Sequence, residues 1–432
     1  MDKTLNNPNI LSNPREFDKA LRKAKKELIK FPSVSGVGYG FKEKRGKSTG
    51  ELAIVVYVKK KSRKVAPAKE RIPAKILGVK TDVVQLGKRQ QESHDDSDMM
   101  FVDFTKVHQQ NAPRIKKAKY TNQQKDPDFG NLAVVVDDGA VDTGSGIDYI
   151  HAYQLFRITH PDAYDFLIFF HDTASGFPGS GSFHNAIFNA TSGINYYAGD
   201  NFNNRAAWGS NKLLAFNVIS PGAWSWPGNM RTILQEVGHY WSAFERFKHF
   251  AAEVADHLDL LLGPTGQGLY HWSRFFDNDH SPMDYDAVDW TEEGGGKFEM
   301  HRVNNEEFYY CNLDLYNMGF LAPNEVGPIR IIKDPHPPSP PATTIYGGLQ
   351  EIGVQNVIWS HGSRNPSHTV AQRLFKTACI ILTKDIDSAA ANAVPVLDDV
   401  RQELTWQFYK ATGFRGKLDT TISPHLKTFV LK

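Results

Sequence analysis

Three short apolar segments constrain the fold of this chain more than any other feature. They are residues 131–137 (NLAVVVD), 164–170 (YDFLIFF) and 213–219 (LLAFNVI). Each holds a run of four or five adjacent apolar residues, which suits a strand buried on both faces and is too short for a core helix. The stretches between them are rich in Gly, Asn, Ser and aromatic residues, which predicts long loops or irregular β structure. We therefore expect a large sheet-containing domain that starts at residue 130.

A smaller domain is predicted ahead of it, at residues 1–88. Its expected elements are an amphipathic helix at 15–30, a hairpin of two strands at 34–41 and 51–58, and a third short strand at 81–86. Residues 89–129 are polar and lack a regular pattern, so they are interpreted as a linker. The chain is thus expected to have an accessory domain, a linker and a main domain.

Charge is distributed unevenly between these parts. Residues 1–90 contain 23 Lys and Arg against 8 Asp and Glu, although the whole chain has a net charge of only +2. One interpretation is an anionic partner, such as nucleic acid or a membrane surface. The other is a solvated, Lys-rich surface, which we favour because no nucleic-acid-binding motif accompanies the charge.

The main domain, residues 130–432, is predicted to be of the α+β class. Three of its parts have distinct patterns, which predict a long helix from 229 to 263, a proline-rich loop at 335–341 and a helical C-terminal part at 365–415. Within the last part, residues 396–412 show the clearest helical periodicity, and Gly413 is a plausible stop.

The most informative pattern lies in residues 227–244 (PGNMRTILQEVGHYWSAF). On a helix capped by Asn229, the side chains of Gln235 and His239 lie on one face, and Glu236 lies beside them. This is the layout of His-Glu-x-x-His, in which two imidazoles hold zinc and the glutamate is a general base toward a water that the metal activates. Here Gln235 replaces the first imidazole, and a carboxamide oxygen is a weaker zinc donor than a ring nitrogen.

The segment LQEVGHYWSAF resembles the active-site helix of zincin metallopeptidases, most closely a group of bacterial proteins with the pattern His-Glu-(Val/Leu)-Gly-His-x-Trp. Other pieces similar to that group follow the same order: YDFLIFFHD, NNRAAWGSNKLLAF, HWS, SPMDY and LDLYNMGFLAPNEV. The resemblance covers about residues 130–425. It implies a metzincin-like peptidase fold with a long active-site helix, zinc as cofactor, Glu236 as base and His239 as metal ligand. Gln235 departs from the pattern.

A third metal ligand has several candidates. In metzincins the helix breaks at a glycine and a ligand follows three residues later; those positions here hold Ser242 and Glu245. On an unbroken helix Glu245 points away from His239, so it is a poor ligand. His271, just past the expected helix end, can fold back and is favoured, with a hydrogen-bonded loop histidine as the alternative. Lesser candidates are Glu253, Asp277 and Asp279.

Each of these residues also has an ordinary structural interpretation. Glu236 can be an exposed helix glutamate, and His239 a core-edge histidine bonded to a backbone carbonyl. Met283 and Met318 follow the helix and can lie beneath the site, as the methionine turn of metzincins does, but core packing is the more common role of such residues.

The first domain has its own likeness. Its segments GVGYGFKEK, TGELAIVVYVKKK and ERIPAKILGVKTDVVQLG resemble a small domain found ahead of trypsin-like domains in some bacterial proteins. The likeness covers about residues 30–87 and implies an autonomous accessory domain. No motif of a trypsin-like catalytic triad follows it.

Several classes of protein are excluded. The chain has two cysteines, Cys311 and Cys379, which rules out a disulfide scaffold and a Cys-rich zinc module. No apolar run approaches the ~20 residues that a membrane-spanning helix needs. The first residues lack the pattern of a secretory signal, so a cytoplasmic location is expected, with leaderless export as the alternative.

Two functions follow from these patterns. One is a zinc-dependent peptidase that hydrolyses peptide or protein substrates through Glu236 and the metal. The other is an inactive pseudopeptidase that binds peptides or another protein. With either, the basic first domain can anchor the chain to an anionic surface. The oligomeric state and the substrate are not indicated by the sequence.

Overall fold

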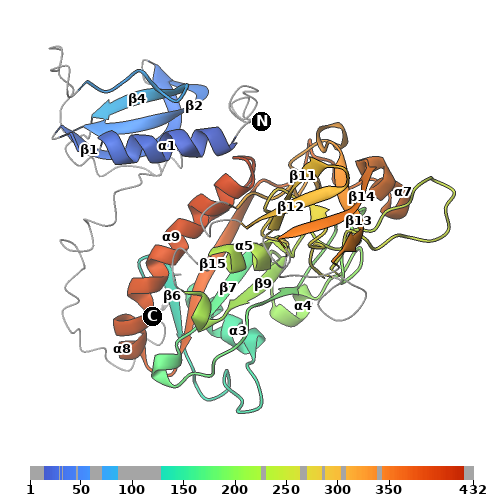
Figure 1. Ribbon diagram of the computed structural model, residues 1–432. Helices are drawn as coiled ribbons and strands as arrows, with labels where there is room; N and C mark the ends of the chain where they lie inside the picture. Colours follow the sequence, from blue (N-terminus) through green and yellow to red (C-terminus); the bar gives the residue numbers. More distant parts are fainter. Residues whose placement is uncertain are drawn as a thin grey trace, which may run out of the picture. The chain divides into compact units, whose positions relative to one another are not determined.

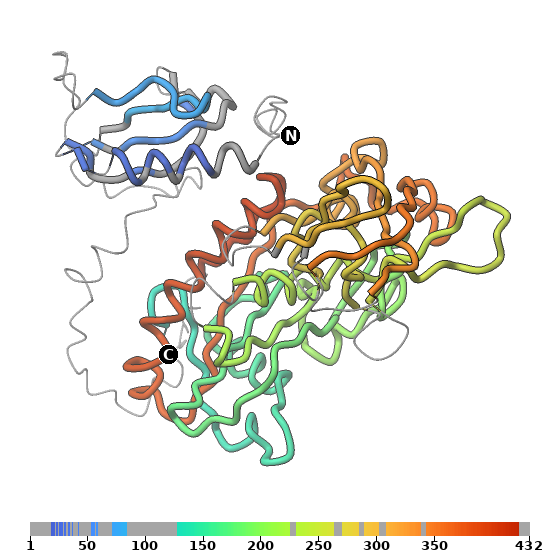
Figure 2. The backbone as a smooth tube through the Cα atoms, in the orientation of Figure 1, coloured from blue at the N-terminus to red at the C-terminus, as the bar shows by residue number. Residues whose placement is uncertain are grey.

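The computed structural model describes eleven stretches of the chain: residues 14–28, 30–31, 33–44, 47–58, 71–85, 128–224, 230–262, 270–284, 288–302, 308–337 and 343–422. The chain divides into two compact units, Met1–Tyr120 and Thr121–Lys432. Figures 1 and 2 draw both units, coloured from the N-terminus to the C-terminus. Of the predicted linker, only residues 128 and 129 are described, and the rest lies outside the described residues.

The first unit holds one helix against a small sheet. Its elements are α1 (Pro14–Leu28), β1 (Val34–Lys44), β2 (Lys47–Val58), β3 (Lys75–Ile76) and β4 (Val79–Gln85). The strands are ordered β1-β2-β4-β3, with β1 antiparallel to β2 and β2 parallel to β4. Ala20, Leu21, Ala24 and Leu28 of α1 are buried, as the amphipathic pattern requires. The predicted helix, hairpin and third strand are confirmed.

A seven-stranded sheet is the centre of the second unit. Its strands are β5 (Asp128–Phe129), β6 (Leu132–Val136), β7 (Phe166–His171), β8 (Phe183–Ala186), β9 (Ala215–Ile219), β15 (Leu374–Thr383) and β16 (Lys417–Asp419). The order is β5-β6-β15-β7-β9-β8, and β16 pairs with β15. The strands β6, β15, β7 and β9 are parallel, whereas β8 is antiparallel to β9. The three apolar segments of the sequence are therefore central strands.

Side chains that alternate along these strands separate two cores. On one face, Phe166, Ile168 and Phe170 join a core with α5 (Met230–Gly238) and α9 (Val394–Ala411). On the other face, Leu167 and Phe169 join a core with α3 (Tyr149–Thr159) and α4 (Arg205–Trp208). Because both faces are covered, every residue of β7 is buried. Figure 1 shows the long α9 running beside the sheet.

The C-terminal part of the main domain corrects one prediction. Residues 365–415 were expected to be helical, but they contain β15, which lies between β6 and β7 in the sheet. The helix expected at 396–412 is confirmed as α9, which begins two residues earlier, and the chain turns at Gly413 with a φ of 61°. The error concerns the segment LFKTACIILT, whose continuous apolar run fits a strand buried on both faces.

A second sheet, of five antiparallel strands, follows α5 in the chain. It is formed by β10 (Phe276–Asp277), β11 (Val288–Gly294), β12 (Lys297–Arg302), β13 (Ile329–His336) and β14 (Thr344–Ile352), in the order β10-β13-β14-β12-β11. Two residues of the predicted proline-rich loop, Pro335 and His336, belong to β13, and residues 338–342 lie outside the described residues. The remaining helices are α6 (Asn312–Asn317), α7 (Val354–His361) and α8 (Ile386–Ser388).

The presence of both helices and several sheets agrees with the predicted α+β class. In the part of the chain that the structure describes, none of the helices is both long enough and apolar enough to cross a membrane.

Candidate functional site

The helix that carries the motif is much shorter than predicted. The helix α5 ends at Gly238, so the expected continuation to residue 263 is wrong. The reason is burial on all sides: residues 236–245 are all buried, whereas a helix on a protein surface buries only one stripe. The irregular path includes Ala243, which has a φ of 72°. Asn229, the predicted cap, lies outside the described residues.

The end of α5 is fixed by close packing around Gly238. A Cβ atom at this position would lie 2.4 Å from Sδ of Met283 and 3.0 Å from Cε1 of Tyr310. The Tyr310 hydroxyl also donates a hydrogen bond to the carbonyl of Leu234, at 2.6 Å. Met283 therefore lies directly against the end of the motif helix, and both Met283 and Met318 are buried members of the same core, which agrees with the core packing favoured for them.

Glu236 lies in the last turn of α5 and is not the exposed helix glutamate of the alternative interpretation. Its exposed fraction is 8%, and burial raises its pKa from the ordinary 4.5 to about 8. A carboxyl group with this pKa holds its proton at neutral pH. Such a group is suited to proton transfer, because its pKa lies close to physiological pH.

His239 follows the helix directly and is also buried, with an exposed fraction of 7%. Burial lowers the pKa of this imidazole well below its ordinary value, and the nearby His271 and His184 lower it further. A backbone hydrogen bond to Ser242 opposes the shift. The ring is therefore neutral at pH 7, and its buried Nδ1 has no hydrogen-bond partner. A neutral imidazole with an unused nitrogen is the form that binds metal ions.

The chain brings His271 to His239, although the two are far apart in sequence. The ring centroids are 5.0 Å apart, and the rings are nearly perpendicular. The backbone of this segment is held by the preceding loop, since the carbonyl of His271 accepts a hydrogen bond from the Leu262 amide at 3.0 Å. The next residue, Trp272, is completely buried. His271 is thus adjacent in sequence to a completely buried side chain.

One buried carboxylate connects the segments that carry the two histidines. The two oxygens of Asp314, in α6, accept four hydrogen bonds. The donors are Ser242 Oγ (2.5 Å), Trp272 Nε1 (2.8 Å), Ser281 Oγ (2.6 Å) and the amide of Cys311 (2.8 Å). Ser242 follows His239 by three residues and Trp272 is adjacent to His271, so Asp314 fixes both segments relative to α6. Burial raises the pKa of Asp314, and the hydrogen bonds to it oppose that rise.

Gln235 lies one helical turn before His239, and the two are linked by a backbone hydrogen bond of 3.0 Å from the His239 amide. The side chain is partly buried, and its Nε2 has no hydrogen-bond partner. An amide at this position offers its oxygen to a metal ion, which is a weaker bond to zinc than an imidazole makes.

The other predicted ligands are placed elsewhere or held by other partners. Glu245 is completely buried and accepts a hydrogen bond from the Phe244 amide at 3.0 Å. It was judged a poor ligand on the assumption of an unbroken helix, and that assumption is wrong because α5 ends at Gly238. Asp277 lies in β10, paired with Arg330 at 3.2 Å. Burial raises the pKa of Asp277 to about 7, and Asp289 adds to the rise. Asp279 is two residues further along, with a φ of 54°.

Zinc fits the arrangement around α5 in part. His239 and His271 are two strong nitrogen donors, and Gln235 is a weak oxygen donor. Within the described residues, the two histidines belong to no group of three His, Cys, Asp or Glu whose ligand atoms all lie within 4.8 Å of one another. The arrangement therefore supplies two strong ligands, whereas catalytic zinc normally has three.

Sequence reasoning missed His184, on the strand β8. Its ring lies 6.5 Å from that of His239, and its Nδ1 is 2.9 Å from Oδ1 of Asn217. Burial lowers its pKa to about 4, so it is neutral at pH 7. A lone histidine in a short strand carries no signal in one sequence; only the pairing of β8 with β9 places it here.

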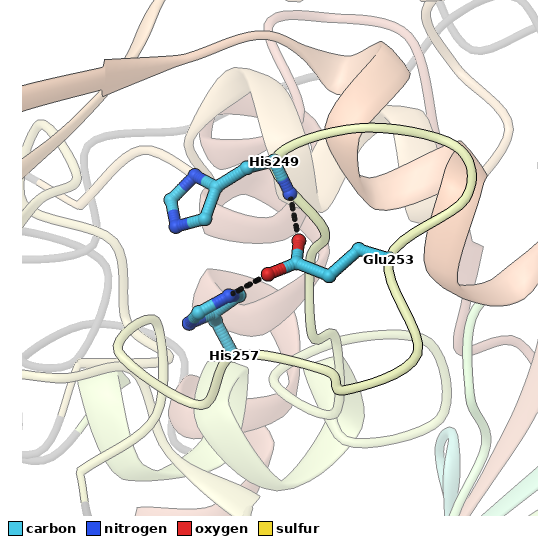
Figure 3. A group of neighbouring side chains, drawn as sticks. All are labelled: His249, Glu253 and His257. Atoms are coloured by element: carbon cyan, nitrogen blue, oxygen red, sulfur yellow. Dashed lines mark hydrogen bonds and ion pairs between the residues drawn. The ribbon is translucent and has the colours of Figure 1, made fainter.

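A second group of histidines was also missed. His249, Glu253 and His257, in the loop after α5, each offer a ligand atom within 4.8 Å of the others (Figure 3). Their regular spacing of four residues was visible in the sequence, but the segment was assigned to the predicted long helix and the two histidines were not considered. Glu253 was considered only as a ligand for the motif helix.

The site around α5 does not coincide with the surface cavity beside α3. That cavity has a volume of about 450 Å³ and is lined by residues that include Tyr149, Asn185 and Trp208. None of the residues predicted for the metal site lines it.

Comparisons of the chain with known protein families, with curated proteins and with solved structures gave no match.

Proposed function

We propose that the second unit is a zinc-dependent peptidase whose site contains Glu236, His239 and His271. The observation that carries this proposal is the pair of histidine rings, 5.0 Å apart, in which the buried Nδ1 of His239 lacks a partner. A buried nitrogen with an unused lone pair costs free energy unless a ligand occupies it. The resemblance of the motif helix to that of zincin peptidases supports the same assignment.

The roles of the residues follow from their protonation. His239 is neutral, because burial lowers its pKa, and it can hold zinc together with His271 and, more weakly, Gln235. Zinc in such a site supplies a Lewis acid that polarises the substrate carbonyl. Glu236 accepts the proton of the attacking water at its carboxylate. With a pKa of about 8 it does so efficiently only when a nearby positive charge lowers that pKa.

The strand β8 offers a way to bind the substrate. It is the last strand of the sheet among the described residues, and it carries His184 next to His239. The edge of a strand can pair with an extended peptide through backbone hydrogen bonds, although at the end of β8 the Ala186 amide already donates to the Tyr197 hydroxyl at 2.7 Å. A peptide bound in this way would pass close to the two histidines, and recognition of its backbone fits a protein or unfolded-peptide substrate.

A second candidate function is peptide binding without hydrolysis. It is favoured by Gln235, which replaces a strong zinc ligand. In the described part of the chain, moreover, no third His, Cys, Asp or Glu joins both histidines in a group whose ligand atoms all lie within 4.8 Å of one another. In that case the same strand edge binds the peptide, and Glu236 stays protonated because no cation lowers its pKa.

Two measurements on the full chain separate these functions: bound zinc after dialysis, and cleavage of casein. We expect the variant Glu236→Gln to keep its zinc and lose at least 100-fold in cleavage rate, the usual contribution of a general base. His239→Ala should lose one equivalent of zinc as well as cleavage. The exposed Asp200 provides a matched control for charge, and Asp200→Asn should change neither.

The variant Gln235→His tests the missing ligand directly. If the site holds zinc, this third imidazole, placed on α5, should raise zinc affinity by more than tenfold and increase cleavage. Casein cleavage that is unaffected by Glu236→Gln would refute the peptidase. Binding of an extended peptide without cleavage, with zinc content unchanged by His239→Ala and without a gain in Gln235→His, would establish the second function instead.

A further inference from the structure

We propose that His249, Glu253 and His257 form a second metal site, in the loop after α5, which binds zinc or a similar divalent transition ion. One nitrogen of each ring and one carboxylate oxygen lie within 4.8 Å of one another. Two imidazoles and a carboxylate are a common ligand set of zinc. This site is independent of the function proposed for Glu236.

The loop is already closed by its backbone. Phe247 and His257 form an antiparallel bridge, in which the His257 amide donates to the Phe247 carbonyl at 2.8 Å and the Phe247 amide donates back at 3.2 Å. Because the bridge joins its two ends, His249 and His257 are held close, and their ring centroids are 4.2 Å apart. A metal ion therefore meets a site that needs little further ordering.

The helix α7 holds the base of this loop from outside. Asn356 accepts a hydrogen bond from the Lys248 amide at 3.0 Å, and its side-chain amide donates to the Lys248 carbonyl at 2.7 Å. The same amide also reaches the carbonyl of His249, at 3.3 Å. In Figures 1 and 2 the loop projects beside α7. The site is thus anchored to the second unit at its base and open to solvent at its tip.

The ligand atoms are oriented by their other contacts. Glu253 Oε2 accepts a hydrogen bond from the His249 amide at 2.5 Å, which leaves Oε1 facing Nε2 of His257 at 2.7 Å (Figure 3). On His249, Nδ1 lies 3.4 Å from Nε2 of Gln350, so Nε2 is the nitrogen that we assign to the ion. Hydrogen bonds between metal ligands and the groups around the site fix the orientation of the rings and raise the affinity for the metal.

The geometry requires only a small adjustment to bind an ion. Zinc bonds to nitrogen and oxygen are ~2.1 Å long, so ligand atoms in a tetrahedral site are about 3.4 Å apart. The bond from Glu253 to His257 is already shorter than this, and an ion would separate the two atoms slightly. The three ligand atoms lie within 4.8 Å of one another, so rotation of the rings would have to bring the more distant atoms to about 3.4 Å. The fourth position would be taken by water, since His249 is exposed.

The experiment measures zinc binding by calorimetry on the chelator-treated full chain, in a His239→Ala background that removes the other proposed site. We expect one equivalent of zinc to bind, with affinity reduced at least tenfold in His257→Ala and in the isosteric Glu253→Gln. Asp256→Asn is the matched control, because this acid lies in the same loop, bonded to Ser360 at 2.6 Å, and is not one of the ligands. It should change the affinity less than twofold.

A second measurement follows the sensitivity of the loop to a protease instead of its affinity for zinc. The loop exposes Phe250, with an exposed fraction of 56%, so chymotrypsin can cut it after this residue. Zinc should slow this cleavage in the His239→Ala chain but not when His257→Ala is added. The proposal is overturned if the His239→Ala chain binds no zinc, or if zinc binds equally well to His257→Ala and Glu253→Gln. Either result leaves the peptidase proposal untouched, because that is tested at His239.

Discussion

Replacing Asp314 by asparagine tests whether this carboxylate holds the two histidine segments together. Each of its oxygens accepts one hydroxyl and one N–H donor: Ser242 and Trp272 on Oδ1, Ser281 and Cys311 on Oδ2. Asparagine keeps only one oxygen. On the side of its NH₂ group the serine hydroxyl can turn and accept, but the N–H group cannot.

The size of the destabilisation follows from the number of hydrogen bonds that the variant loses or weakens. One buried N–H loses its acceptor, which costs about 1–3 kcal/mol. The remaining hydrogen bonds lose the charge of their acceptor and weaken by roughly half. Part of this is offset because a neutral amide is easier to bury than a carboxylate. We therefore expect Asp314→Asn to lower the free energy of unfolding of the second unit by about 2–4 kcal/mol.

The assay is urea denaturation followed by tryptophan fluorescence. All eight tryptophans lie after residue 200, so the signal reports on the second unit alone. The exposed Asp200→Asn removes the same charge without such contacts and should change the unfolding free energy by less than about 0.5 kcal/mol. An Asp314→Asn chain as stable as the parent would refute the network as a structural anchor.

Three further predictions concern α5, each measured by urea denaturation of zinc-free protein. Burial raises the pKa of Glu236 to about 8, so the protonated side chain contributes fully to the free energy of unfolding below pH 4.5, and this contribution is lost as the pH rises through 8. In Glu236→Gln the free energy of unfolding should no longer fall for this reason between pH 5 and 9. Gly238→Ala should destabilise by about 1–3 kcal/mol through overlap with Met283, and less when Met283→Ala is added; equal effects would contradict the overlap. Tyr310→Phe removes the bond to the Leu234 carbonyl and should cost about 1 kcal/mol, whereas no loss would mean that the bond is replaced.

The central strands could be predicted because their sequences are unambiguous. Phe166 to Phe170 is an apolar run too short for a helix, and it lies in β7. The strand β15 was missed because ACIIL is equally apolar and lies in a segment where a helix was expected. A buried run of this kind fits a strand or a buried helix equally well, and only its partners in the sheet decide.

The site could be predicted in its parts but not in its geometry. The spacing of Gln235, Glu236 and His239 identified the helix, yet the same reasoning extended that helix to residue 263. The apolar residues that follow Gly238 fit a helical period, but the core buries them on every side, which local periodicity cannot reveal. His184 could not be found, because its approach to His239 depends on strand pairing alone.

The place of β15 in the middle of the sheet has a consequence for synthesis on the ribosome. The strands β6 and β7 are made about 240 and about 200 residues before the strand that separates them, so both are present without it for about 10–40 s at ~5–20 residues per second. Throughout that interval both present unpaired apolar edges, which can join to each other in a wrong register or to another nascent chain. We expect this polypeptide to depend on chaperones that bind early, and to fail as a soluble product when translation stops before residue 374.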